Sequence, residues 1–204
     1  MTNIKLFKGD IPADLSFDES VAVDCEMMGL DLHRDRLCLV QLGDGKGNAY
    51  LVQIIPGKEY PNLKKLMTDE KVLKIFHYAR MDVAKILNDL GVMVYPVYCT
   101  KIASKLCRTY TSFHGLKNVC YDLLGVTLSK EQQTSDWGAK ELSDEQMQYA
   151  ATDVLYLHAL KNKLDELLKR EGRYELAQEC FNFLGTRAKL DLLSFDEPDI
   201  FAHH

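Results

Sequence analysis

Short apolar runs separated by turns fill the first half of the chain, and longer stretches with helical spacing fill the second half. Apolar and β-branched runs bounded by turn residues are typical of strands. Strands are therefore predicted at residues 21–26, 37–42, 49–54, 72–76 and 92–97. The segment 43–48 reads Gly-Asp-Gly-Lys-Gly-Asn, which predicts a hairpin connection between the second and third strands.

Apolar positions three and four residues apart predict the helices. They cover residues 61–68, 79–90, 100–106, 114–124 and 174–184. Ser143 and Gln146 match a capping box, and the apolar positions behind them continue to Leu167, which predicts one long helix. Strands first and helices later indicate an α/β domain with a mixed central sheet flanked by helices, and we expect a single domain over residues 1–204.

Composition narrows the class of protein. The 204 residues are 47% hydrophobic and 27% charged, which suits a soluble globular chain able to bury a core. No apolar run approaches the roughly 20 residues of a spanning helix, and the N-terminus has no apolar signal segment, so a cytoplasmic protein is expected and no membrane partner. The six cysteines include no C-x-x-C pair, which favours reduced thiols. The net charge of −5 argues against coating nucleic acid by charge alone.

Acidic side chains stand out on three of the predicted elements. Asp24 and Glu26 are two apart in the first strand, so both leave the same face. Two such acids repel each other unless a divalent cation lies between them, although two solvated acids on an edge strand would give the same pattern. Asp82 lies in the first turn of a predicted helix, where it could equally serve the helix dipole. Asp153 follows Tyr149 by four residues, which places phenol and carboxylate on one helical face.

Four carboxylates on three elements, with a tyrosine at fixed spacing, resemble the DEDD 3′→5′ exonucleases of the tyrosine subgroup, to which RNase D belongs. The first motif is Asp24-Cys25-Glu26-Met27-Met28-Gly29-Leu30, the second ends in Asp82, and the third is Tyr149-Ala150-Ala151-Thr152-Asp153. The similarity continues through His114-Gly115-Leu116 and the segment 130–137, and covers about residues 20–165. It implies an RNase H-like (DnaQ-like) exonuclease fold with its catalytic core in that range.

The same resemblance implies two divalent ions, Mg²⁺ or Mn²⁺, that clamp the attacking and leaving oxygens of a phosphodiester. By analogy Asp24 bridges both ions, Glu26 and Asp153 complete the first, and Asp82 holds the second through water. Tyr149 orients the attacking water and could help to deprotonate it. The expected products are 5′-mononucleotides released from the 3′ end.

Substrate contacts are expected beside this centre. Met27, Gly29 and Leu30 match family positions near the terminal nucleotide, with Leu30 as a wedge between the last two bases. Met28 stands where many members have threonine, so a hydroxyl contact to the 3′ end could be missing. His77 also matches a position near the substrate, and a structural histidine is the alternative.

A stretch without acids, residues 90–121, holds Lys101, Lys105, Arg108 and Lys117. Arg108 and His114, interleaved there with aromatic rings, suit a phosphate track. An ordinary solvated helix face is the competing interpretation. Trp137 follows a polar run and is predicted to face the substrate, with a core anchor as the alternative.

Only about 35 residues follow the long predicted helix, which leaves no room for the helical RNA-binding domains of RNase D. The chain resembles the bacterial nano-RNase C group in its length and in the segments Lys8-Gly9-Asp10 and His33-Arg34-Asp35-Arg36-Leu37-Cys38. This resemblance implies that the substrates are dinucleotides and other short RNAs, with DNA as a further possibility. It also implies that the protein forms ring-shaped octamers. The apolar region within 171–204 would suit such an interface or pack onto its own domain. A broader RNase D-like exonuclease and a non-catalytic nucleic-acid-binding protein remain the alternatives, and the intact acidic set argues against the latter.

Overall fold

A computed structural model describes residues 3–129, 134–195, 200–201 and 203. Its centre is one mixed sheet in the order β1-β4-β3-β2-β5-β6. The strands are β1 (Asn3–Phe7), β2 (Ser20–Met27), β3 (Leu37–Gly43), β4 (Asn48–Gln53), β5 (Leu73–Phe76) and β6 (Val97–Cys99). Strands β2, β3 and β4 are antiparallel neighbours, whereas β1 joins β4, and β5 and β6 join β2, in parallel. The predicted mixed sheet and its hairpin at 43–48 are confirmed.

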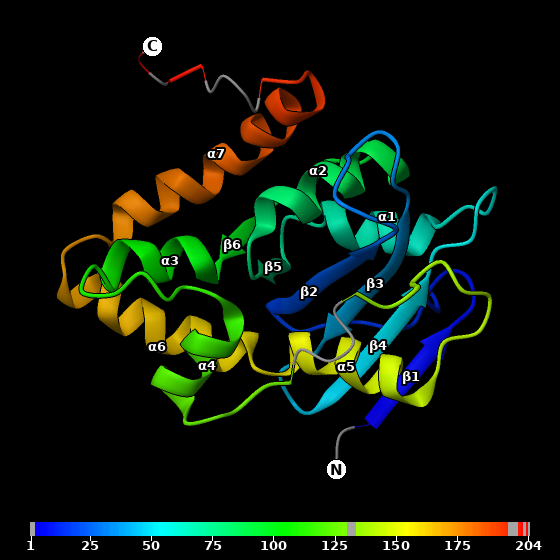
Figure 1. The fold of residues 1–204 in the computed structure, drawn as a ribbon, viewed down its shortest axis with the longest axis horizontal. Helices are drawn as coiled ribbons and strands as arrows, with labels where there is room; N and C mark the ends of the chain where they lie inside the picture. Colours follow the sequence, from blue (N-terminus) through cyan, green and yellow to red (C-terminus); the bar gives the residue numbers. More distant parts are fainter. Residues whose placement is uncertain (1–2, 130–133, 196–199, 202, 204) are drawn as a thin grey trace.

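Seven helices surround the sheet in the described part of the chain. They are α1 (Pro61–Thr68), α2 (Ala79–Leu90), α3 (Thr100–Cys107), α4 (Leu116–Leu124), α5 (Asp144–Leu155), α6 (Leu157–Arg170) and α7 (Tyr174–Leu192). Helix α5 crosses strands β1 to β4 on one face, α2 packs on the other, and α3, α4 and α6 gather beyond β5 and β6 (Figure 1). None of these helices, in the described ranges, is long and apolar enough to cross a membrane.

The structure differs from the prediction at three elements. Residues 92–96 form no strand, and β6 begins only at Val97, because Pro96 has no N–H to offer a sheet ladder. The single long helix after Ser143 is two helices, which meet at Tyr156, since the apolar spacing continues across the break while the helix axis changes. Strand β1 was not predicted, because its half-buried Ile4 and Leu6 gain their partner only from β4, more than 40 residues away.

The core explains why the other predictions succeed. One apolar cluster runs from Ile11 through β2 and α2 to Ala188 in α7, and a second, smaller cluster joins Leu39, Leu51, Trp137 and Ala150 between the sheet and α5. The capping box of Ser143 and Gln146 is present at the start of α5. The cysteines are all free and five of the six are buried, as expected for reduced thiols.

Candidate active site

Three carboxylates from two elements meet over the middle of the sheet. One oxygen each from Asp24, Glu26 and Asp153 lie within 4.8 Å of one another. Asp24 and Glu26 come from β2, where Val23 and Cys25 alternate with them and are buried in the opposite face. Asp153 comes from the last turns of α5, more than 120 residues later. The structure therefore brings together acids that only the tertiary fold can unite.

Gly43 lets α5 come close enough to deliver Asp153. A Cβ atom at Gly43 would lie 2.9 Å from the backbone oxygen of Val154, the residue after Asp153. Real Cβ atoms do not approach a backbone oxygen so closely, so α5 rests directly on the end of β3. This contact fixes the height of α5 above the strand that carries Asp24.

Asp82 lies beside the three acids, in the first turn of α2. It is buried, at 5% exposure, and accepts a hydrogen bond from the thiol of Cys25. It is not one of the three acids that share the 4.8 Å cluster, although its charge acts on Asp24 and Glu26. All four predicted carboxylates thus lie in one site, with Asp82 at its side.

The carboxylates raise one another's pKa. Burial, followed by repulsion from Asp82, Asp153 and Glu26, holds the pKa of Asp24 well above its usual range. Burial also raises the pKa of Glu26 to about 9, that of Asp82 to about 8 and that of Asp153 to about 7. The protein therefore concentrates carboxylates where, without a cation, they resist ionising together.

Tyr149 lies one turn before Asp153 on α5 and donates its hydroxyl hydrogen bond to that carboxylate. Burial and the surrounding acids raise the pKa of Tyr149, so the phenol keeps its proton. Trp137 packs beside it, with ring centroids 6.1 Å apart. Trp137 is only 2% exposed and belongs to the small apolar cluster under α5. The prediction that Trp137 faces the substrate is therefore wrong: it supports the ring of Tyr149 from the interior.

Gln41 is a member of the site that sequence reasoning missed. It lies on β3 directly opposite Asp24, and its Nε2 donates to Asp24 Oδ2 at 3.3 Å. The strand pattern could have signalled it, because Gln41 is the one polar residue in a strand that is buried throughout.

The residues after β2 form a loop that stands beside the carboxylates. Leu30 is 82% exposed at its tip, and Met27 packs against the core at its base. Gly29 is required inside the loop, since a Cβ atom there would lie 2.3 Å from Asp35 Oδ2. The backbone at Gly29 thus lies close to the Asp35 carboxylate of the same chain. Leu30 remains free to contact a ligand.

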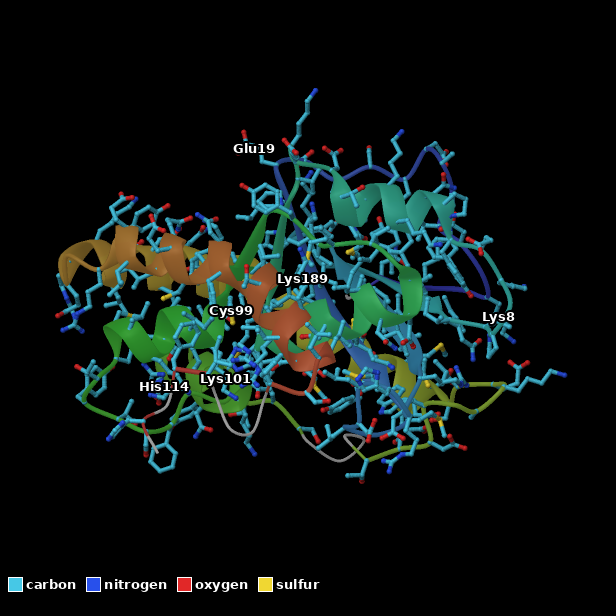
Figure 2. The ribbon with its side chains drawn as sticks, turned by 90° about the horizontal axis from the view of Figure 1, so that it is seen from above. Lys8, Glu19, Cys99, Lys101, His114 and Lys189 are labelled. Atoms are coloured by element: carbon cyan, nitrogen blue, oxygen red, sulfur yellow. The ribbon has the colours of Figure 1, made fainter. Side chains whose placement is uncertain are left out.

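His77 and His114 lie together near the start of α2. Nδ1 of His77 is 2.8 Å from Thr100 Oγ1, and burial lowers the pKa of His77 to about 3, so its ring is neutral. Nδ1 of His114 is 3.0 Å from Ser104 Oγ. Figure 2 shows His114 beside Lys101. Burial lowers the pKa of both histidines, and the charge of Lys101 adds to the effect. Lys101 and the two histidines are half-buried, whereas Lys105 and Lys117 of the predicted basic surface are exposed.

Arg108 requires a correction. It is completely buried, pairs with Asp122, and donates to Ser104 Oγ at 3.0 Å and to the backbone oxygen of Phe113 at 3.2 Å. Those contacts stabilise the turn between α3 and α4, so the predicted phosphate contact through Arg108 is wrong. Sequence spacing showed a cation among aromatic residues but could not show that its guanidinium points inward.

The donor set fits a divalent metal centre. Hard cations such as Mg²⁺ prefer carboxylate oxygens, and the oxygens of Asp24, Glu26 and Asp153 already converge. Their raised pKa values show four acids that lack a compensating charge, since no lysine or arginine pairs with any of them among the described ion pairs. A divalent ion would supply that charge and return the acids to their ionised form.

Comparison with known proteins also indicates a nuclease. The 3′-5′ exonuclease family matches residues 10–169. Ribonuclease D of Gluconacetobacter diazotrophicus is 32% identical over 155 residues, which are 76% of this chain and 39% of that protein. Ribonuclease D of Sphingobium indicum is 36% identical over 154 residues, 75% of this chain and 39% of that protein. The chain thus spans about two fifths of the length of these curated relatives.

Solved structures extend the likeness to the whole chain. Brucella melitensis NrnC bound to pGG is 50% identical, with a TM-score of 0.96 and 100% of both chains covered. The same nuclease with bound Mg²⁺ is 49% identical, with a TM-score of 0.94 and the same coverage. Escherichia coli RNase D, at 27% identity, has a TM-score of 0.76 over 84% of this chain and 45% of that one, which confirms the RNase H-like fold. The chain is therefore a 3′-5′ exonuclease and belongs to the tyrosine-type, RNase D-like family, in the group that contains NrnC (nano-RNase C).

Proposed function

We propose that this exonuclease hydrolyses very short RNAs, dinucleotides above all, to 5′-mononucleotides. The observation that carries the proposal is the full-length likeness to NrnC bound to pGG, combined with an intact set of four acids and a tyrosine. The family makes the chain an exonuclease, and the length of its substrate is the part proposed here.

We assign two divalent ions, Mg²⁺ or Mn²⁺, to Asp24, Glu26, Asp82 and Asp153. Asp24 would be shared by both ions, Glu26 and Asp153 would complete one, and Asp82 would hold the other through water. Bound there, such ions supply charge neutralisation at the phosphodiester and a more acidic water.

The chain's own residues then position the substrate and the attacking water. Tyr149, as a protonated donor, holds the Asp153 carboxylate and orients the water nearby. Leu30 at the exposed loop tip would insert between the two bases, with Met27 and Gly29 shaping the loop behind it. His77 and His114, beside Lys101, would line the other end of a short substrate.

A time course with 5′-labelled RNAs of two, three, seven and twenty nucleotides tests this function. Each RNA is incubated with Mg²⁺, with Mn²⁺ and with EDTA, and Asp24→Asn protein serves as the control. We expect the dinucleotide to disappear fastest, only with metal, and not with the variant. Equal laddering of the 20-mer would instead support the broader RNase D-like activity, and DNA versions of the same oligonucleotides measure sugar discrimination.

We also propose that the chain forms a homo-oligomer, for which the nano-RNase C resemblance implies eight copies. Phe181 and Leu184 of α7 pack onto their own core, but Phe183, Leu193 and Phe195 remain 39%, 68% and 45% exposed. Exposed apolar clusters of this kind mark contact surfaces. Light scattering should give a mass several times 23.3 kDa, and Leu193→Glu should lower it.

A further inference from the structure

Gln41 occupies a position where a leucine would pack without difficulty. It is completely buried in β3, and Leu39 and Leu51 lie beside it on the face that α5 covers. A buried amide costs free energy unless both of its ends are hydrogen-bonded. Nε2 donates to Asp24 Oδ2 at 3.3 Å, but Oε1 has no partner among the described residues. The buried amide therefore lowers the stability of the fold, and the packing of the sheet does not explain why it is there.

The register of the sheet directs this amide at one residue. Asp24 and Gln41 are paired directly across the antiparallel β2–β3 ladder, so their side chains leave the same face as neighbours. A hydrogen bond to one carboxylate oxygen fixes the rotation of the whole group and leaves the second oxygen, Oδ1, to other ligands.

The chemistry of glutamine suits this task better than that of other residues. A lysine or arginine at position 41 would place a positive charge beside Asp24 and compete with a metal ion. An acid would add to the repulsion among four carboxylates that is already present. A neutral amide donor stabilises the ionised carboxylate and leaves its charge available to the cation.

We propose that Gln41 is a positioning residue, which orients the Asp24 carboxylate for metal binding from the strand behind it. This inference rests on the proposed metal site and adds to it a residue outside the acidic motifs. Residues that hydrogen-bond to metal ligands commonly contribute 10- to 100-fold in metal affinity when they are removed.

The test measures metal binding without substrate or turnover. Mn²⁺ is titrated into wild-type, Gln41→Leu and Gln41→Met proteins, and free Mn²⁺ is followed by electron paramagnetic resonance. We expect at least about 10-fold weaker binding in both variants. Their melting temperatures in EDTA should stay close to wild type, because leucine and methionine satisfy the apolar surroundings. Methionine, with the length and lack of branching of glutamine, covers the case in which leucine misfolds.

Gln53→Leu is a matched control, because Gln53 is a buried glutamine on the same face of the neighbouring strand. Its Nε2 donates to the backbone oxygens of Ala139 and Lys140, not to an acid. This variant should lose stability and keep its Mn²⁺ affinity. Wild-type affinity in both Gln41 variants, with binding lost in Asp24→Asn, overturns the role of Gln41 alone. Wild-type affinity in Asp24→Asn as well overturns the metal site and this inference with it.

Discussion

At the scale of single residues, Tyr149 combines two contacts that can be separated. Its ring packs on Trp137, and its hydroxyl donates to Asp153. Because burial and the surrounding acids raise the pKa of Tyr149, the hydroxyl keeps its proton and can donate it to the hydrogen bond with Asp153. The hydroxyl thus holds the Asp153 carboxylate in place.

Tyr149→Phe keeps the ring and removes only the hydroxyl. We expect kcat on the dinucleotide to fall about 10²-fold, in the range lost with one positioned proton donor or acceptor. Thermal stability and Mn²⁺ affinity should change little, since the phenyl ring still packs on Trp137 and the four acids remain. Steady-state kinetics with a parallel Mn²⁺ titration checks this.

Tyr50→Phe is the control, because Tyr50 lies on β4 and packs on Phe7 and Phe17. It should leave kcat unchanged. If Tyr149→Phe turned over at the wild-type rate, the hydroxyl would have no part in the reaction.

At the scale of elements, the site depends on how closely α5 lies on the sheet. Gly43→Ala would place a methyl group 2.9 Å from the backbone oxygen of Val154, so α5 must move away from β3. Overpacking of this kind typically costs about 1–3 kcal/mol of stability. Asp153 moves with α5, and we therefore expect weaker Mn²⁺ binding as well as a lower melting temperature.

Gly185→Ala separates this effect from the general cost of replacing a glycine. Gly185 lies in α7, where an added Cβ would meet only the flexible end of Met93, at 3.2 Å. Metal affinity should be unchanged in that variant. A Gly43→Ala protein that melted earlier but bound Mn²⁺ normally would show that Asp153 does not depend on the height of α5.

The same element shows what the sequence could and could not predict. The capping box and the Tyr149–Asp153 spacing are local, so both are visible in the sequence and present in the structure. The partners of these residues are not local: Gln41 meets Asp24 only through the β2–β3 register. The predicted phosphate contact through Arg108 was wrong for a related reason, since the sequence pattern of a helix does not reveal whether an arginine side chain points inward or outward.

At the scale of the whole molecule, the clustered acids lower stability, and a bound divalent metal would remove that loss. In the metal-free protein the pKa values of Asp153, Asp82 and Glu26 are about 7, about 8 and about 9. In the unfolded chain the same groups release their protons near pH 4. Between these values the folded state holds protons that the unfolded state has lost, so the stability of the metal-free protein falls as the pH rises from about 4, until the pH has passed the folded values of about 7 to 9.

Buried histidines change the stability of the folded state with pH in the opposite direction. The pKa of His77 is lowered to about 3, so its neutral ring favours folding more as the pH rises through the unfolded value near 6.5. The melting temperature of one sample measured over a range of pH therefore combines the contributions of the carboxylates and of the histidines. The histidine contribution is common to samples with and without metal, and it cancels when the two melting temperatures are subtracted.

We therefore expect the increase in melting temperature caused by saturating Mg²⁺ to grow between pH 5.5 and 8.5. At low pH protons already neutralise the acids, whereas at high pH only the cation can do so. For a chain of this size each kcal/mol corresponds to about 2–4 °C, so the growth should reach several degrees. Asp24→Asn, with one fewer charge among the acids, should melt higher than wild type in EDTA at pH 8.5 and gain less from Mg²⁺. An increase that stayed constant with pH would mean that the ion binds somewhere other than these carboxylates.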